Sequence, residues 1–150
     1  MIDEAGAFIS MNRQDDLLER VGSGAQGAVY KAVDRLLGTT VAIKVLKPEN
    51  AANEEAVNRL RREIILARDI AHPNVVRMYH LGESDGMTYL IMQWIEGPVL
   101  SKLIARDGPL PLAYAIQIAE KTASALAAAH ALKVLHRDIK ASNILIDGAG

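Results

Sequence analysis

The sequence predicts an α+β fold in which a β-rich, antiparallel part is followed by a mainly helical part. Three observations support this order. Strand-forming runs separated by turn residues recur across residues 21–94, and an alanine-rich stretch with helical spacing covers Leu112–His130. Between them, Gly97-Pro98 is typical of a linker.

The β-rich part contains several strand-forming segments. Residues 1–16 have little periodic structure and are interpreted as an N-terminal tail. Pro48 ends one of the segments, and a turn is expected around Ser84-Asp85-Gly86. The segments are Val21–Lys31, Thr39–Leu46, Val75–Leu81 and Thr88–Trp94.

Helices are predicted at three places. Asn53-Glu54-Glu55 offers a capping residue followed by acids in the first turn, and apolar residues then recur at helical spacing up to Ala67. A short helix is expected over Val99–Ala105, and a long one over Leu112–His130 with an apolar face. Ile144–Ile146 is predicted to be a short buried strand.

Composition limits the class of protein. The chain has 150 residues, of which 50% are apolar and 23% charged, as in globular proteins. A net charge of −1 gives no reason to expect nucleic-acid binding, and no apolar run approaches the roughly 18 residues of a membrane span. There are no cysteines, and the acidic start of the chain is unlike a secretory signal. We therefore expect a cytoplasmic protein.

A glycine-rich segment is the first sign of phosphate chemistry. Gly22 to Val29 reads G-x-G-x-x-G-x-V, in which glycines let backbone N–H groups approach a phosphate closely. An ordinary glycine-rich hairpin fits the same pattern. A dinucleotide-binding turn is a third reading, but it requires a helix directly after the glycines. Ala28–Val33 is instead predicted to be a strand.

The second sign is Lys44, in the run Val41-Ala42-Ile43-Lys44. Strand alternation places Ala42 and Lys44 on one face, and a lysine on a mostly apolar face needs an anionic partner. Bound phosphate together with Glu63, on the first predicted helix, would supply that charge. In the alternative interpretation, Lys44 extends from a strand edge into water and Glu63 is a solvated acid.

The strongest sign is the loop His136-Arg137-Asp138-Ile139-Lys140-Ala141-Ser142-Asn143. Phosphoryl transfer to a hydroxyl needs a group that holds the attacking oxygen, a cation for the transferring phosphate and an oxygen ligand for magnesium. Asp138, Lys140 and Asn143 are the candidates for these roles. Each residue alone is weak evidence, but a chance polar turn rarely combines all three at these spacings.

Together these motifs resemble the eukaryotic-like protein kinase family, and in particular its bacterial serine/threonine branch. The resemblance runs from about Leu17 to Asp147. It implies a partial kinase domain over residues 17–150, with the small lobe and hinge at 17–95 and the start of the large lobe at 96–150. It also implies ATP and Mg²⁺ as cofactors and a protein serine or threonine hydroxyl as acceptor.

The resemblance assigns positions as well. Lys44, braced by Glu63, would hold the α- and β-phosphates, and the glycines would cover the phosphates. Met92 would be the gatekeeper, and the backbone of Gln93 and Ile95 would bind adenine. The residues implied to surround the nucleotide are Val21, Gly22, Gly24, Gly27, Val29, Ala42, Lys44, Met92, Gln93, Ile95 and Leu145.

Some positions depart from the family pattern. Lys133 stands where glycine is common before the catalytic loop, Ala141 where proline is common, and Gln93 where glutamate is frequent. None of these changes removes a reacting group. Lys140, two positions after Asp138, resembles serine/threonine rather than tyrosine kinases.

The family places an Asp-Phe-Gly motif, which carries the main magnesium ligand, roughly a dozen residues past Asn143. The 150 residues do not include it. We therefore expect the isolated chain to bind ATP weakly, to transfer little or no phosphate, and to expose the apolar face of its long helix. The alternatives are a non-catalytic nucleotide- or partner-binding module of the same fold and a small-molecule phosphotransferase.

Overall fold

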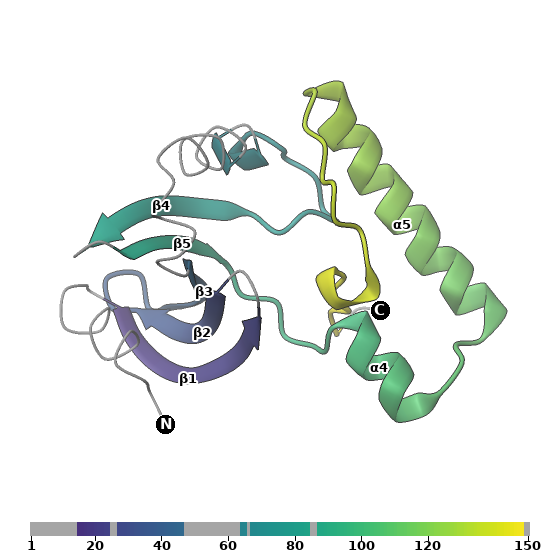
Figure 1. The fold of residues 1–150 in the computed structure, drawn as a ribbon, viewed down its shortest axis with the longest axis horizontal. Helices are drawn as coiled ribbons and strands as arrows, with labels where there is room; N and C mark the ends of the chain where they lie inside the picture. The colour runs from purple at the N-terminus through teal and green to yellow at the C-terminus, as the bar shows by residue number, and fades with distance from the viewer. Residues whose placement is uncertain (1–14, 25–26, 47–63, 66, 85–86, 149–150) are drawn as a thin grey trace. The chain divides into compact units, whose positions relative to one another are not determined.

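The computed structural model describes residues 15–24, 27–46, 64–65, 67–84 and 87–148 (Figure 1). Two compact units make up the chain. The sheet unit comprises Met1–Arg68 and Arg77–Trp94, and the helical unit comprises Asp69–Val76 and Ile95–Gly150. A five-stranded antiparallel sheet in one unit and helices α4 and α5 in the other confirm the predicted α+β class.

An antiparallel sheet of five strands forms the sheet unit, in the order β1-β2-β3-β5-β4. Most predicted strands are confirmed, but the predicted start of the segment Val75–Leu81 is wrong, because β4 begins at Met78. β1 begins at Asp15, slightly inside the predicted tail. The strands are β1 Asp15–Gly24, β2 Gly27–Asp34, β3 Thr39–Leu46, β4 Met78–Ser84 and β5 Met87–Gln93.

One face of this sheet carries its hydrophobic core. Tyr30 and Ile43 are fully buried at its centre, where β2 and β3 lie side by side. Because side chains alternate between the two faces of a strand, residues between the core positions point to the opposite face. The core residues are Tyr30, Ala32, Val41, Ile43, Val45, Tyr89 and Ile91.

The helical unit contains α4 (Leu100–Asp107), α5 (Leu112–Ala131) and the short 3-10 helix η1 (Ala141–Asn143). Both predicted helices after residue 98 are confirmed, whereas η1 was not expected. The predicted helix after Asn53 lies mostly outside the described residues, and residues 64, 65, 67 and 68 at its end are helical.

The prediction of a buried strand at Ile144–Ile146 is wrong. Leu145 forms a single antiparallel bridge with Val99, and its side chain is 41% exposed. Leu100 N–H donates to the Ile144 carbonyl at 2.8 Å, and Ile146 N–H donates to the Pro98 carbonyl at 2.9 Å. One bridge to one neighbouring segment leaves the Leu145 side chain largely uncovered.

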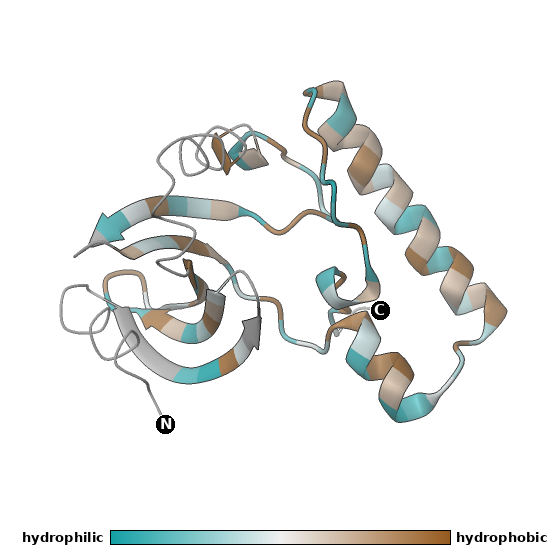
Figure 2. Ribbon diagram, viewed as in Figure 1, coloured by the Kyte–Doolittle hydropathy of each residue, from teal (hydrophilic) through white to brown (hydrophobic). Residues whose placement is uncertain are grey.

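Apolar residues lie along α5, as Figure 2 shows. Of the twenty residues in this helix, all of which the structure describes, Ala129 is the buried one. Leu112 is 76% exposed and Ile116 is 50% exposed, so the expected exposed apolar face is present. Among the described residues, no helix combines the length and apolarity that crossing a membrane requires.

The C-terminal end of α5 forms a Schellman motif. Val134 N–H donates to the Ala129 carbonyl at 3.0 Å, and Lys133 N–H donates to the His130 carbonyl at 2.9 Å. In this motif the residue after the C-cap adopts a left-handed conformation that favours glycine. Lys133 occupies that position with φ of 60°. The replacement of the common glycine by Lys133 therefore puts a side chain at a position whose backbone conformation favours glycine.

Replacing Lys133 with glycine is expected to raise the free energy of unfolding by about 1 kcal/mol. Removing the Cβ relieves the left-handed strain, and the greater freedom of glycine in the unfolded chain offsets part of the gain. Lys102→Gly, within α4, is the control and should destabilise by about 1 kcal/mol. Urea unfolding measures both. A lower urea midpoint for Lys133→Gly than for the original chain would contradict the prediction.

Candidate active site

In the sheet unit, the strand register brings several predicted site residues together. Lys44 on β3 pairs with Val29 on β2 and with Leu90 on β5. Ala42, two residues earlier, pairs with Met92 on β5. These residues alternate with the core positions, so Val29, Ala42, Lys44 and Met92 share the face opposite the core. This face combines apolar side chains with the half-buried ammonium group of Lys44.

The three predicted glycines differ in their surroundings. Gly22 and Gly24 lie on β1, and Gly24 pairs with Gly27 at the start of β2. Gly27 has φ of 146°, and a Cβ added there would overlap the carbonyl oxygen of Val45. At Gly22, no described atom lies within 4 Å of such a Cβ. Packing therefore requires glycine at position 27, whereas the described residues leave room for a side chain at position 22.

The end of β5 is anchored to the segment before β4. Gln93 N–H donates to the Arg77 carbonyl at 2.9 Å, and Arg77 N–H donates to Gln93 Oε1 at 3.3 Å. A backbone bond from Gln93 to adenine would therefore have to come from its carbonyl oxygen. Val21 is half-buried on β1. Glu63 lies outside the described residues, so its pairing with Lys44 stays a prediction.

Two further residues on this face, Lys31 and Trp94, were not singled out by sequence reasoning. The Lys31 ammonium lies 4.7 Å from the centre of the Trp94 ring. Lys31 pairs with Ala42 across β2 and β3. Lys31 lies two positions after Val29 on the same strand, and this spacing could have placed it on the same face. Its contact with Trp94 could not be predicted, because it depends on the order of three strands.

In the helical unit, the loop after α5 brings two of the predicted site residues, Lys140 and Asn143, to the carboxylate of the third, Asp138. Lys140 Nζ lies 2.9 Å from Asp138 Oδ2, and Asn143 Nδ2 donates to the same oxygen at 3.0 Å. Asn143 Nδ2 also donates to the Asp138 carbonyl at 2.8 Å. The helix η1 sets this geometry, because it places Asn143 within reach of Asp138.

The surroundings of Asp138 favour its charged form. The hydrogen bond from Lys140, followed by that from Asn143, lowers the pKa of the Asp138 carboxyl below its usual range. Asp138 N–H donates to His136 Nδ1 at 3.4 Å, which places the proton of neutral His136 on Nε2. Arg137 between them has φ of 61°, so the loop is held in a conformation that side chains rarely adopt.

Asn143 is suited to hold a cation. Its amide nitrogen faces Asp138, so its Oδ1 points away from the carboxylate, and oxygen ligands are those that Mg²⁺ prefers. Within the described residues, no cluster of three or more His, Cys, Asp or Glu side chains could hold a metal ion. The described residues therefore support one ligand for such a metal site, the Oδ1 atom of Asn143.

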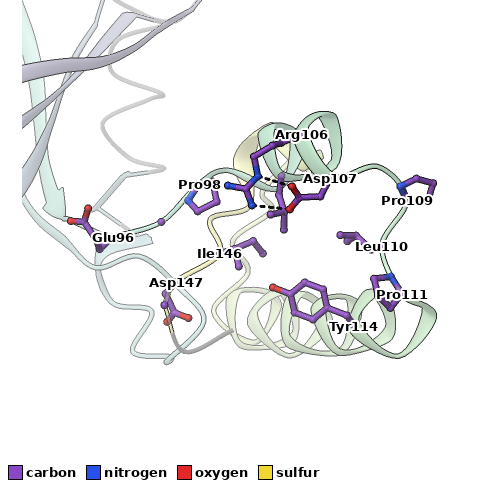
Figure 3. A pocket seen from close by; sticks show the side chains of 13 residues that line it. Glu96, Pro98, Arg106, Asp107, Pro109, Leu110, Pro111, Tyr114, Ile146 and Asp147 are labelled. Carbon is purple, nitrogen blue, oxygen red and sulfur yellow. Dashed lines mark hydrogen bonds and ion pairs between the residues drawn. The ribbon is translucent and has the colours of Figure 1, made fainter.

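A separate pocket of about 580 Å³ lies between α4, the start of α5 and residues 146–148 (Figure 3). Leu110, Tyr114 and Ile146 are among its apolar lining residues, and Arg106 forms an ion pair with Asp107 at 2.6 Å beside them. Neither Asp138 nor Lys140 nor Asn143 lines it. This pocket is therefore distinct from the group of catalytic candidates.

A five-stranded antiparallel sheet with a lysine on the face opposite its core, together with an Asp-Lys-Asn loop, is the combination that the resemblance to protein kinases predicts. The chain belongs to the protein kinase family, whose protein kinase domain model matches residues 16–150. It is 42% identical over 134 residues to serine/threonine-protein kinase PrkC of Bacillus subtilis, covering 89% of this chain and 21% of PrkC. It is 36% identical over 147 residues to serine/threonine-protein kinase PknA of Mycobacterium tuberculosis, covering 95% and 34%.

A solved structure agrees with the fold. The crystal structure of the Mycobacterium tuberculosis PknI kinase domain matches with a TM-score of 0.80 and 29% identity, covering 89% of this chain and 56% of that one. The protein-kinase-like fold and the family predicted from the motifs are thus confirmed. The chain spans about a fifth of the length of PrkC and about a third of that of PknA.

Proposed function

We propose that this chain supplies the nucleotide-binding and catalytic-loop parts of a serine/threonine protein kinase. The reaction transfers the γ-phosphoryl group of MgATP to a serine or threonine hydroxyl of a protein. The observation that carries the proposal is a cluster around one oxygen atom. Asp138 Oδ2 forms an ion pair with Lys140 at 2.9 Å and accepts a hydrogen bond from Asn143 Nδ2 at 3.0 Å. Base, cation and metal-ligand candidates are then within one hydrogen bond of each other.

Each group has a stated task. The Asp138 carboxylate accepts a hydrogen bond from the acceptor hydroxyl and orients its oxygen, and it takes the proton as the new P–O bond forms. A lowered pKa suits this role, because a loose transition state needs orientation more than a strong base. Lys140 neutralises charge on the transferring phosphoryl group.

The nucleotide is assigned to the face of the sheet that lies opposite its core. Lys44 binds the α- and β-phosphates there, and Val29 and Ala42 cover the adenine base. Met92 shares this face, and the backbone carbonyl of Gln93 binds the base edge. Ile95, in the helical unit, stays the second backbone group that the family resemblance implies. Mg²⁺, when bound, would neutralise charge on the phosphates, and Asn143 would hold it through Oδ1.

Serine or threonine as acceptor is supported by two observations. Lys140 lies two positions after Asp138, as in serine/threonine kinases. PrkC and PknA are both named serine/threonine-protein kinases. We also propose that the isolated 150-residue chain transfers little phosphate, because the family's Asp-Phe-Gly motif is not among these residues.

The test uses the longest in-frame product that includes these 150 residues, beside the 150-residue chain itself. Both receive MgATP labelled in the γ-phosphate and two peptide libraries, one with serine and threonine and one with tyrosine as acceptors. We expect the longer product to label the serine/threonine library and the isolated chain to label neither. Labelling of tyrosine alone, or of neither library by the longer product, would reject the proposal.

Replacing Lys44 with methionine is expected to weaken ATP binding by about ten- to a hundredfold, the size of a lost hydrogen bond to a charged group. Thermal unfolding of the 150-residue chain with increasing ATP measures it. The melting temperature of the original chain should rise, and that of Lys44→Met should not. Lys102→Met, at an exposed position on α4, is the control and should respond like the original chain. An equal rise in Lys44→Met would contradict the assignment.

A further inference from the structure

The contact between Lys31 and Trp94 joins β2 to the residue that follows β5. The Lys31 ammonium lies 4.7 Å from the ring centre, within the range of a cation–π interaction. Both side chains are half-buried, and both belong to the sheet unit. Trp94 is also the last residue of that segment, since Ile95 belongs to the helical unit.

The strand order makes this contact a long-range one. β3 lies between β2 and β5, so Lys31 reaches across a whole strand to meet Trp94. Neighbouring strands are about 4.8 Å apart, so β2 and β5 are separated by about 10 Å. The lysine side chain and the tryptophan ring close that gap together, and the residue between them on β3 is the small Ala42. The pair therefore lies beside Ala42 and Met92, on the face assigned to adenine.

Gln93 provides a second anchor for the same backbone. Its N–H and its side-chain Oε1 both bond to Arg77, at 2.9 Å and 3.3 Å. Successive residues are thus tied to different parts of the sheet: Gln93 to the segment before β4, and Trp94 to β2. Two anchors in different directions hold a strand end more firmly than either alone.

We propose that Lys31 is a positioning residue that fixes the backbone of Gln93 and Trp94 through the Trp94 ring, and so sets the affinity for the adenine base. The second part rests on the proposed ATP-binding function. The first part does not, because it concerns the sheet unit alone.

Glu19 offers a competing explanation for Lys31. It pairs with Lys31 across β1 and β2, and opposite charges at paired positions attract. If that attraction were the role of Lys31, removing the charge of Glu19 would loosen the sheet as much as removing Lys31. Glu19→Gln is therefore the matched control.

The deciding measurement is amide hydrogen exchange of Gln93, whose N–H bonds to Arg77, in the 150-residue chain. Losing a partly exposed cation–π contact should speed local opening by about two- to fivefold in Lys31→Met. Lys31→Arg should restore slow exchange, and Glu19→Gln should leave it unchanged. Fluorescence of Trp94, the chain's one tryptophan, should change in Lys31→Met and not in Glu19→Gln.

Unchanged Gln93 exchange in Lys31→Met overturns the inference, and so does equal acceleration in Glu19→Gln. Titration with ATP then tests the second part: Lys31→Met should bind about two- to fivefold more weakly than the original chain. If the original chain binds no ATP, the proposed function fails while Gln93 exchange still decides the role of Lys31. If ATP binds equally well to both, Lys31 does not set adenine affinity.

Discussion

Replacing Asp138 with asparagine is expected to lower the rate of phosphoryl transfer by about 10²- to 10⁴-fold, the usual contribution of a positioned acid–base group. Asparagine keeps the shape of the side chain but loses the charge that holds Lys140 at 2.9 Å and that, in the proposed mechanism, takes the proton of the acceptor hydroxyl. The assay measures kcat in the longest in-frame product that contains the chain. A rate within threefold of the original, roughly 0.7 kcal/mol in barrier height, would contradict the role.

Asp107→Asn is the matched control for this change. Asp107 is also exposed and also pairs with a basic side chain, Arg106, at 2.6 Å. Its hydrogen bond from Arg106 lowers its pKa, as Lys140 lowers that of Asp138. The same chemical change, away from the catalytic loop, should leave kcat unaltered. Melting temperatures of both variants should stay close to the original, because surface ion pairs contribute little to stability.

The pH dependence provides an independent check on Asp138. Its pKa is lowered in the folded chain, so the charged carboxylate is present above the ordinary aspartate value of about 3.9 and is lost as the pH falls through the lower, folded value. Transfer should therefore show no decline caused by Asp138 between about pH 8 and pH 5. An inflection in that interval that disappears in Asp138→Asn would contradict the lowered pKa.

The strands could be predicted from the sequence because alternation and turn residues are local signals. β3 and β5 lie within a residue of their predicted bounds. β4 begins later than predicted because residues before it are held by the helical unit. Val75 N–H donates to the His72 carbonyl at 3.1 Å, His72 Nε2 lies 3.0 Å from Ser124 Oγ, and Asn74 Nδ2 donates to the Lys121 carbonyl at 3.3 Å. The local turn and the two contacts with α5 override the strand propensity of Val75 and Val76.

In the candidate site, too, the local features could be predicted from the sequence and the long-range contacts could not. Residue types and spacings named Asp138, Lys140 and Asn143 directly, because a loop of eight residues needs no long-range information. The motif did not reveal that both Lys140 and Asn143 turn to the same oxygen of Asp138, nor that η1 brings Asn143 there. The Lys31–Trp94 contact was out of reach as well, since it requires the order of β2, β3 and β5.

The glycines of the G-x-G-x-x-G segment give the second large effect, and here the structure separates residues that the motif treats alike. Gly27→Ala is expected to destabilise the sheet unit by about 2–6 kcal/mol, combining an unfavourable backbone conformation with overpacking. Gly27 has φ of 146°, and the new Cβ would overlap the Val45 carbonyl on the neighbouring strand β3. A rigid backbone atom cannot move aside as a side chain could.

Gly22→Ala is the matched comparison. It adds the same methyl group on β1, where no described atom lies within 4 Å of the added Cβ. Its urea midpoint should therefore stay near that of the original chain, while its ATP affinity falls if the open space receives phosphate. If Gly22→Ala and Gly27→Ala lowered the urea midpoint equally, both glycines would be required for folding, and the predicted difference between them would be wrong. Gly22→Ala with unchanged ATP affinity would remove Gly22 from the nucleotide site and leave the motif's first glycine without a binding role.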